Sequence, residues 1–361
     1  MTVDLISTKN GRDSKYELAK VAAILLIILS HVAHQSSVDA FAFNTDAIIK
    51  AISVYLGQIG NGVFIISTCY FLTKGITAKK WIKLYLQTIF YSIVFLAYFS
   101  FFQPEAVSLK TIVKSFFPIA FENNWFISAY LIFVLLVPVL QVIREHLKTK
   151  QYFYLTICFF MLYTVAPTFI GNRYFSSRLF GFITVYLITT LLKDVDFIRF
   201  VKTWQLCMLS IIGCCIVVAF IITVNYIGQY IGIIYGKTFF WQSYSSLPLL
   251  VVNFSVFEIL RRSKSWHNKF INCLSKSSLG IYLIHNNFLI VECKKINDWF
   301  KCFDGMFIVH RYILITVIVF VVSLLLDKTR ELFFAKIDNI LTDWFLSKIL
   351  YPIKHRIDAI F

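Results

Sequence analysis

Charged residues are scarce in this chain: they make up 15% of its 361 residues, against about 25% in an average soluble domain. Acidic residues are the scarcer sign, with 19 Asp and Glu against 35 Lys and Arg and a net charge of +16. Hydrophobic residues reach 58%, above the roughly 45–50% that soluble domains carry. These proportions exclude a water-soluble enzyme and a disordered chain.

The sequence also lacks the cysteine and histidine spacings that are typical of metal and disulfide sites. Its eight Cys residues form no Cys-x-x-Cys pair. Most of them lie inside apolar segments, where free thiols behave as small hydrophobic groups. We therefore expect no bound metal and no disulfide-stapled scaffold. No small-residue cleavage site follows the first apolar segment, so we expect that segment to be an uncleaved helix and not a signal peptide.

Long apolar segments dominate the chain instead. A membrane-spanning helix needs about 20 apolar residues, and ten segments can be marked on this basis. They cover residues 18–35, 51–72, 83–102, 125–143, 152–170, 177–193, 204–227, 240–260, 273–292 and 309–326. Helices are the expected spanning structure, because lipid offers no hydrogen-bond partners to an open backbone. The sequence predicts an all-α, polytopic integral membrane protein with about ten transmembrane helices.

The distribution of Lys and Arg predicts how these helices are oriented. If the N-terminus is cytoplasmic, most of the 35 cations fall in breaks on the cytoplasmic side, as the positive-inside rule requires. The C-terminus is then cytoplasmic too. We expect a cytoplasmic tail over residues 1–17, a membrane domain over 18–328, and a cytoplasmic amphipathic tail over 329–361 that binds anionic membrane lipid. Topology accounts for the net charge, so nucleic acid is not an expected partner.

The first apolar segment carries ionisable residues at membrane depth. Lys20 and His31 are 11 residues apart, which places both on one helix face, with His31 about 16 Å further along the axis. His34 follows one turn later, toward the outer surface. Such residues are costly in lipid and indicate functional sites by default. The alternative is that His31 hydrogen-bonds a neighbouring helix while Lys20 extends to the water interface.

Further polar residues lie near the ends of the third and fourth segments. Lys80 and Lys83 share a helix face at the inner end of the third segment and could bind phosphate, although topology signalling explains them as well. Glu122, Asn124 and Trp125 stand at the outer mouth of the fourth segment. There the carboxylate could orient a sugar hydroxyl and the indole ring could stack on a sugar. The alternative for these three is an aromatic belt residue beside ordinary loop polarity.

Two outer arginines and a second deep histidine complete the candidates. Arg173 and Arg178 lie on the outer side, against the charge trend, which suggests an anionic ligand. His285 lies deep in the ninth segment. It is either functional or a hydrogen-bond partner between helices.

Taken in chain order, these motifs resemble the membrane acyltransferase-3 (integral membrane O-acyltransferase) family of bacteria over nearly the whole chain. The Firmicute surface-polysaccharide O-acetyltransferase branch is especially similar. The segments that carry the resemblance are Arg12-Asp13-Ser14-Lys15-Tyr16-Glu17-Leu18, Lys20-x10-His31, Lys80-Trp81-Ile82-Lys83, Asn124-Trp125-Phe126-Ile127-Ser128-Ala129-Tyr130, Ser278-Leu279-Gly280-Ile281-Tyr282-Leu283-Ile284-His285 and Asp327-Lys328-Thr329-Arg330. The chain departs from the family where Lys20, Lys80 and Lys83 stand in place of arginine, which keeps the charge but loses the bidentate grip.

The resemblance implies transfer of an acyl group, most often acetyl, from acyl-coenzyme A to a hydroxyl of a surface glycan or lipid-linked oligosaccharide at the bacterial plasma membrane. Acetyl-coenzyme A is then the donor substrate, and the oligomeric state stays open. Under this reading, His31 is the general base or carries a transient acyl group. The remaining expected roles are catalysis for Glu122, coenzyme A binding for Lys20, Lys80 and Lys83, and acceptor binding for His34, Asn124, Trp125, Arg173 and His285.

A membrane protein of this size need not be an enzyme, and a non-enzymatic flippase or transporter of glycan precursors is the alternative function. Transporters of that kind often contain internal repeats. The two halves of this sequence show no clear repeat, which weakens the alternative. A polytopic sensor is a third option, and it would tolerate replacement of His31 by Gln.

Overall fold

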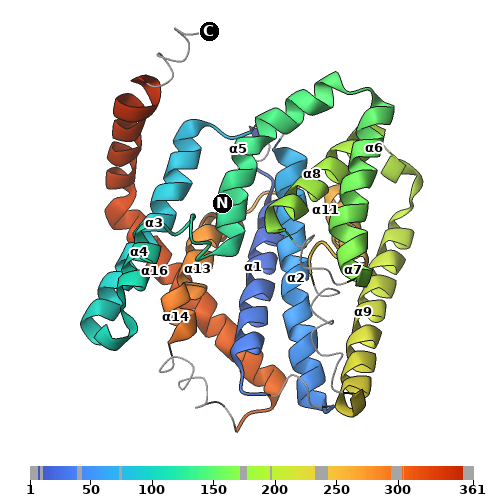
Figure 1. Cartoon of the computed structure of the whole chain (residues 1–361), viewed down its shortest axis with the longest axis horizontal. Helices are drawn as coiled ribbons and strands as arrows, with labels where there is room; N and C mark the ends of the chain where they lie inside the picture. Colours follow the sequence, from blue (N-terminus) through green and yellow to red (C-terminus); the bar gives the residue numbers. More distant parts are fainter. Residues whose placement is uncertain are drawn as a thin grey trace.

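The computed structural model is a bundle of α-helices (Figure 1). It describes residues 7–8, 11–38, 43–72, 75–170, 177–195, 197–231, 243–293, 303 and 305–352. Within these ranges the only strands are β1 (Ser7–Thr8) and β2 (Gly11–Arg12), which form a short antiparallel hairpin before the first helix. The predicted helical fold class is confirmed, with this hairpin as the one addition.

Nine longer helices carry the described part of the fold. They are α1 (Ser14–Gln35), α2 (Thr45–Phe71), α3 (Ala78–Phe102), α5 (Trp125–His146), α6 (Thr149–Phe160), α8 (Arg178–Val195), α9 (Thr203–Ile231), α11 (Leu247–Arg262) and α16 (Ile308–Phe345). The shorter elements are η1 (Pro104–Ala106), α4 (Leu109–Phe116), η2 (Met161–Val165), α7 (Ala166–Ile170), η4 (Phe197–Phe200), α12 (Lys269–Lys276), α13 (Ser278–His285), α14 (Phe288–Glu292) and η5 (Leu346–Leu350). Since α6, η2 and α7 follow one another directly, they form one continuous helical stretch.

Helix α1 is the most buried of the candidate membrane spans, and it lies beside α2 (Figure 1). Asp13 caps its first turn by accepting a hydrogen bond from the backbone N–H of Lys15, which satisfies one of the donors left over at a helix start. Gly60 of α2 faces α1 so closely that a Cβ there would overlap the carbonyl oxygen of Ala23. Glu17 and Lys20, on the first turns of the same helix, are buried at 1% and 5% exposed, so the protein shields these two charged residues from lipid.

Seven helical stretches in the described ranges are long and apolar enough to cross a membrane. They are Ser14–Gln35, Thr45–Phe71, Ala78–Phe102, Trp125–His146, Thr149–Phe169, Thr203–Val224 and Ile308–Leu350. Large apolar side chains on several of them face outward and are exposed, among them Phe101, Leu135, Ile211 and Leu325. Such an extended apolar exterior suits lipid and not water. The chain is a multi-pass membrane protein.

Three of the ten predicted segments fall outside these seven stretches. Segment 177–193 forms α8, and segment 240–260 forms α11, whose first predicted residues lie outside the described part of the chain. The prediction of one continuous helix over 273–292 is wrong, because α12, α13 and α14 replace it with breaks at Ser277 and Asn286. Asn287 supports the second break by capping α14, since its side chain accepts a hydrogen bond from the N–H of Leu289. A broken helix is tolerated at membrane depth where protein surrounds its backbone.

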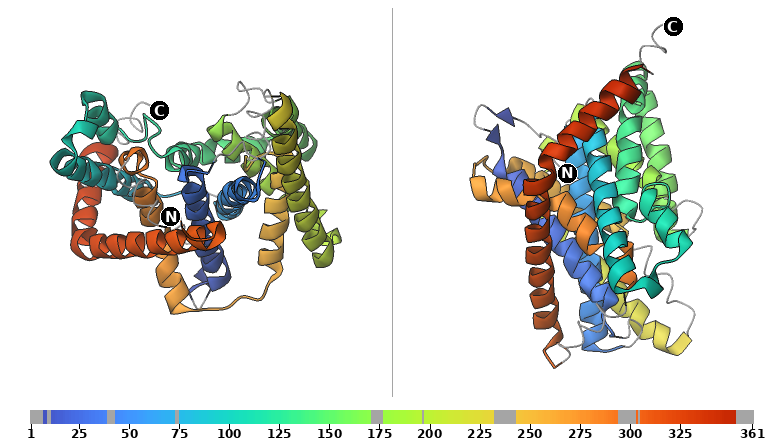
Figure 2. Two further views of the ribbon diagram at one scale, coloured as in Figure 1. Left: turned by 90° about the horizontal axis from the view of Figure 1, so that it is seen from below. Right: turned by 90° about the vertical axis from the view of Figure 1, so that its left-hand side faces the viewer.

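Helix α16 continues through the domain boundary predicted at residue 328. It runs uninterrupted to Phe345, so the expected C-terminal tail begins within a helix. Figure 2 shows that this helix, coloured orange to red, changes direction along its length. Asp327 lies near its middle, where it accepts a 2.7 Å hydrogen bond from the hydroxyl of Tyr91. Gly280 of α13 leaves room for this carboxylate, because a Cβ there would overlap it.

Candidate functional site

Two histidines from distant parts of the sequence meet inside the bundle. His31 lies on α1, and His285 is the last residue of α13. Nδ1 of His31 is 3.1 Å from Nε2 of His285, and the two ring centroids are 5.2 Å apart. His285 is buried and His31 is half-buried. The two deep histidines that the sequence suggested separately therefore form one pair.

A backbone carbonyl determines where the protons lie in this histidine pair. Nδ1 of His285 is 2.6 Å from the carbonyl oxygen of Ile281, one turn earlier in α13. Because a carbonyl oxygen only accepts, Nδ1 of His285 carries the proton, and Nε2 of the neutral ring is an acceptor. Nδ1 of His31 then donates to that Nε2, which leaves a lone pair on Nε2 of His31. The pair thus presents a nitrogen that can take a proton from a hydroxyl group.

The break between α13 and α14 brings side-chain amides next to the histidine pair. Asn286 follows His285 directly, and its Nδ2 lies 3.2 Å from the hydroxyl of Tyr282 and 3.5 Å from Oδ1 of Asn124. Asn124 precedes α5 and is 4% exposed. The predicted site residue Asn124 is therefore connected to the histidine-bearing segment. Amides at this position can hydrogen-bond a hydroxyl or a carbonyl group of a ligand.

A second cluster lies at the start of α5. NH1 of Arg178 is 3.2 Å from Oε2 of Glu122, and the guanidinium carbon lies 5.2 Å from the ring centroid of Trp125. Trp125 stacks on Tyr244, with centroids 6.0 Å apart and planes inclined by 11°. Glu122 also adopts a φ of 49°, a left-handed conformation that is rare outside glycine and tends to occur at functional sites. Asn124 lies between Glu122 and Trp125 in the sequence and contacts Asn286. It therefore links this cluster to the segment that carries His285.

Part of this second cluster was predicted from the sequence. Arg178 was expected to be an outer cation that binds an anionic ligand, whereas in the structure its partner is Glu122. Tyr244 was not predicted, because a tyrosine in an apolar segment carries no signal and lies far from Trp125 in the chain. Arg173 lies outside the described residues. His34 is exposed on α1, one turn beyond His31.

Lys20, which was expected to bind coenzyme A, forms an ion pair within the protein. Its Nζ lies 2.9 Å from Oε1 of Glu17, and both side chains are buried, at 5% and 1% exposed. The other oxygen of Glu17 accepts a hydrogen bond from Ser275 of α12. Glu17 therefore compensates the charge of Lys20 and ties α1 to α12.

The basic residues at the start of α3 contact the second half of α16. Nζ of Lys83 donates a 2.6 Å hydrogen bond to Oδ1 of Asn339, and Lys79 forms a 2.8 Å ion pair with Asp343. Lys80, between them, is half-buried. Lys83, which was expected to bind coenzyme A, thus contacts the C-terminal part of the chain through Asn339 but stays exposed.

Comparison with known families decides the class of protein. The acyltransferase domain model of the acyltransferase-3 family matches residues 13–328, which includes the histidine pair and the start of α5. The chain belongs to the acyltransferase-3 family. It is a multi-pass membrane acyltransferase. No curated protein and no solved structure matched the chain in the two other comparisons.

The described part of this acyltransferase offers no site of a composition that binds metal. Across the described ranges, no group of three or more His, Cys, Asp and Glu residues is arranged to hold an ion.

Proposed function

We propose that this acyltransferase moves an acyl group, expected to be acetyl, from cytoplasmic acyl-coenzyme A to a hydroxyl of a cell-surface or exported polysaccharide. The observation that carries the proposal is the hydrogen-bond chain from Ile281 through His285 to His31. In this proposal, Nε2 of His31 is the proton acceptor. The motif resemblance supports the Firmicute surface-polysaccharide branch and the bacterial plasma membrane as its location.

The proposed reaction moves one proton and exchanges one bond. Nε2 of His31 takes the proton of the acceptor hydroxyl while the hydroxyl oxygen forms a bond with the acyl carbon. The carbon–sulfur bond then breaks, and the leaving thiolate receives the proton from His31. General-base catalysis of this kind contributes about 10²- to 10⁴-fold in rate. An acyl group carried briefly on His31 is the second possible route.

His285 acts in this scheme as a positioning residue. Its Nε2 lies 3.1 Å from Nδ1 of His31, so it holds the ring with Nε2 directed away from the pair. When His31 becomes an imidazolium, the same nitrogen accepts a hydrogen bond from a charged donor, which is stronger than a neutral one. The bond from His285 to Ile281 keeps the acceptor nitrogen of His285 unprotonated throughout.

The proposed topology brings donor and acceptor to the site from opposite faces. With both termini cytoplasmic and about ten spans, the N-terminal end of α1 faces the cytoplasm, where acyl-coenzyme A is found. The start of α5 then faces outward. In this arrangement Glu122, Asn124 and Trp125 bind and orient the acceptor sugar, with Arg178 holding Glu122 in place.

A transfer assay with two histidine variants tests the proposal. Membranes that contain the protein are incubated with acetyl-coenzyme A labelled in the acetyl group and with surface polysaccharide, and label on the polysaccharide is counted. We expect transfer by the wild type, loss of at least 100-fold in His31→Ala from the general-base contribution, and retention in His310→Ala. His310 is an exposed histidine of α16 and serves as the matched control.

The two failures of this assay have different meanings. Transfer that survives in His31→Ala leaves an acyltransferase but removes His31 as its base. Absence of transfer by the wild type, with acetyl and succinyl donors and with polymer and lipid-linked acceptors, contradicts the proposed reaction.

A further inference from the structure

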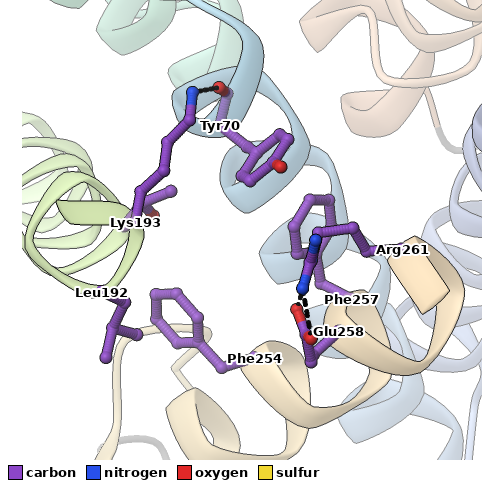
Figure 3. Close-up of a pocket in the computed structure, with 8 residues that line it drawn as sticks. Tyr70, Leu192, Lys193, Phe254, Phe257, Glu258 and Arg261 are labelled. Atoms are coloured by element: carbon purple, nitrogen blue, oxygen red, sulfur yellow. Dashed lines mark hydrogen bonds and ion pairs between the residues drawn. The ribbon is translucent and has the colours of Figure 1, made fainter. Parts of the chain in front are cut away.

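A cavity of ≈ 180 Å³ opens where the ends of α2, α8 and α11 converge (Figure 3). Its lining residues come from these three helices and are Tyr70, Thr189, Leu192, Lys193, Phe254, Phe257, Glu258 and Arg261. The helix ends belong to the side that the Lys and Arg distribution assigns to the cytoplasm. The cavity lies apart from the histidine pair and from the start of α5, and none of its residues has a role in the proposed reaction.

The charges at the mouth of this cavity favour an anion. The carboxylate of Glu258 binds Arg261 through two hydrogen bonds of 2.7 and 2.8 Å and also binds Arg262 at 2.7 Å. One carboxylate thus compensates two guanidinium groups, and Glu258 raises the pKa of Arg261, which keeps that side chain charged. Lys193 adds a further cation across the cavity (Figure 3). With three cations and one carboxylate, the opening of the cavity carries a net positive charge.

Lys193 is placed where a ligand can reach its ammonium group. Its side chain is exposed, and Nζ donates a 3.2 Å hydrogen bond to the backbone carbonyl of Tyr70. The neighbouring carboxylate of Asp194 is bound by Arg144, with Oδ2 at 2.9 Å from Nε, and so does not compete for Lys193. An ammonium has three donors, of which the carbonyl takes one.

The wall of the cavity is aromatic. The ring of Tyr70 lies 4.7 Å from Nζ of Lys193 and 5.2 Å, centroid to centroid, from the ring of Phe257. Phe254 lines the same space. Aromatic rings next to cations are the combination that binds an aromatic base carrying phosphate groups, because a ring accepts the base by stacking and the cations bind the phosphate.

The aromatic wall also continues to the helix that carries the proposed base. The ring of Phe257 lies 6.4 Å from that of Tyr16 on α1. Tyr16 precedes His31 by 15 residues, which is about 22 Å along a helix. A ligand held in the cavity is therefore separated from the histidine pair by a distance that only an extended molecule can span.

We propose that this cavity binds the nucleotide end of the acyl donor, with its phosphate groups on Lys193 and Arg261 and its base against Tyr70 and Phe257. The inference rests on the proposed use of acyl-coenzyme A. It moves the donor-binding role away from Lys20 and Lys83, which contact Glu17 and Asn339.

The test uses a fragment of the donor that cannot react. Adenosine 3′,5′-bisphosphate contains the base and phosphates but has neither the long arm nor the thioester. Its affinity for the purified full chain in detergent is measured by isothermal titration for the wild type, Lys193→Gln and Lys150→Gln. Lys150 is an exposed lysine of α6, so both variants lose one exposed positive charge.

We expect Lys193→Gln to weaken fragment binding about tenfold, as loss of one charge-assisted hydrogen bond to phosphate predicts, and Lys150→Gln to leave it unchanged. In the transfer assay, Lys193→Gln should raise KM for acyl-coenzyme A without lowering kcat, because it acts far from the reacting atoms. A second variant, Tyr70→Leu, should weaken binding of the fragment but not of inorganic phosphate.

Three results would overturn the inference. The first is equal fragment affinity in Lys193→Gln and Lys150→Gln while the wild type still transfers acyl groups, which leaves the proposed function intact. The second is a lower kcat in Lys193→Gln at unchanged KM. The third is that Lys193→Gln binds phosphatidylglycerol vesicles more weakly than the wild type does while its affinity for the fragment is unchanged. That result would assign the cavity to a lipid headgroup. Absence of both transfer and fragment binding in the wild type refutes the proposed function as well.

Discussion

Replacing His285 is the sharpest test of the histidine pair, because the structure gives this side chain a defined task. Its Nε2 accepts the Nδ1–H of His31 at 3.1 Å. In His285→Ala that donor loses its acceptor while His31 and its helix stay in place. The variant therefore separates the positioning of His31 from its presence.

The expected magnitude follows from the charge that develops on His31. A hydrogen bond to a charged group contributes about 1.5–3 kcal/mol, and His31 is charged only after it has taken the proton. Loss of this bond raises the barrier by the same amount, which lowers kcat roughly 10- to 150-fold. In His285→Gln an amide oxygen can replace Nε2 as acceptor, so we expect activity above that of His285→Ala.

The assay is the rate of label transfer at saturating donor and acceptor, with equal amounts of folded protein established by gel filtration in detergent. His310→Ala serves again as the histidine control. Two results would refute the reasoning: full activity in His285→Ala, or equal activity in the Ala and Gln variants. The second would mean that His285 fills space and does not act through an acceptor atom.

Two further predictions concern the packing of Gly280 and the cluster at the start of α5. Gly280→Ala adds a Cβ that overlaps the carboxylate of Asp327. We expect it to lower the free energy of unfolding by about 1–3 kcal/mol. Thermal unfolding in detergent measures this change, and an unchanged Tm contradicts the prediction. Glu122→Gly removes the cost of a φ of 49° in a residue with a Cβ, on the order of 1 kcal/mol, but also the ion pair with Arg178. We expect an unchanged or higher Tm together with a raised KM for the polysaccharide, and an unaltered KM would show that Glu122 does not serve the acceptor.

The local features of the fold could be predicted from the sequence, because they depend on nearby residues. The lengths of the apolar segments predicted most of the long helices, whereas the orientation derived from the charge distribution stays a prediction. The ion pair of Lys20 with Glu17, three residues earlier, could also have been found, since residues at this spacing share a helix face. The continuation of α16 was equally visible: the chain from Ile308 to Tyr351 contains neither Gly nor Pro, and a rise in charge at Asp327 does not end a helix.

The features that make the site depend on contacts between distant segments. His31 and His285 are separated by 254 positions, and a single sequence carries no information that they touch. The break after His285 had a weak signal in the paired Asn286 and Asn287, which interrupt an apolar segment. Tyr244 had none. The cavity between α2, α8 and α11 arises only when three helix ends converge, and so no local pattern indicates it.

The central claim is that His31 and His285 act as one unit in acyl transfer, and a double-mutant cycle tests it directly. The measurement is kcat for the wild type, His31→Ala, His285→Ala and the double variant. If His285 acts only through His31, the double variant should have the same kcat as His31→Ala. Losses that multiply, with the double variant lower by the product of the two single effects, would show that the histidines act independently and would contradict the account.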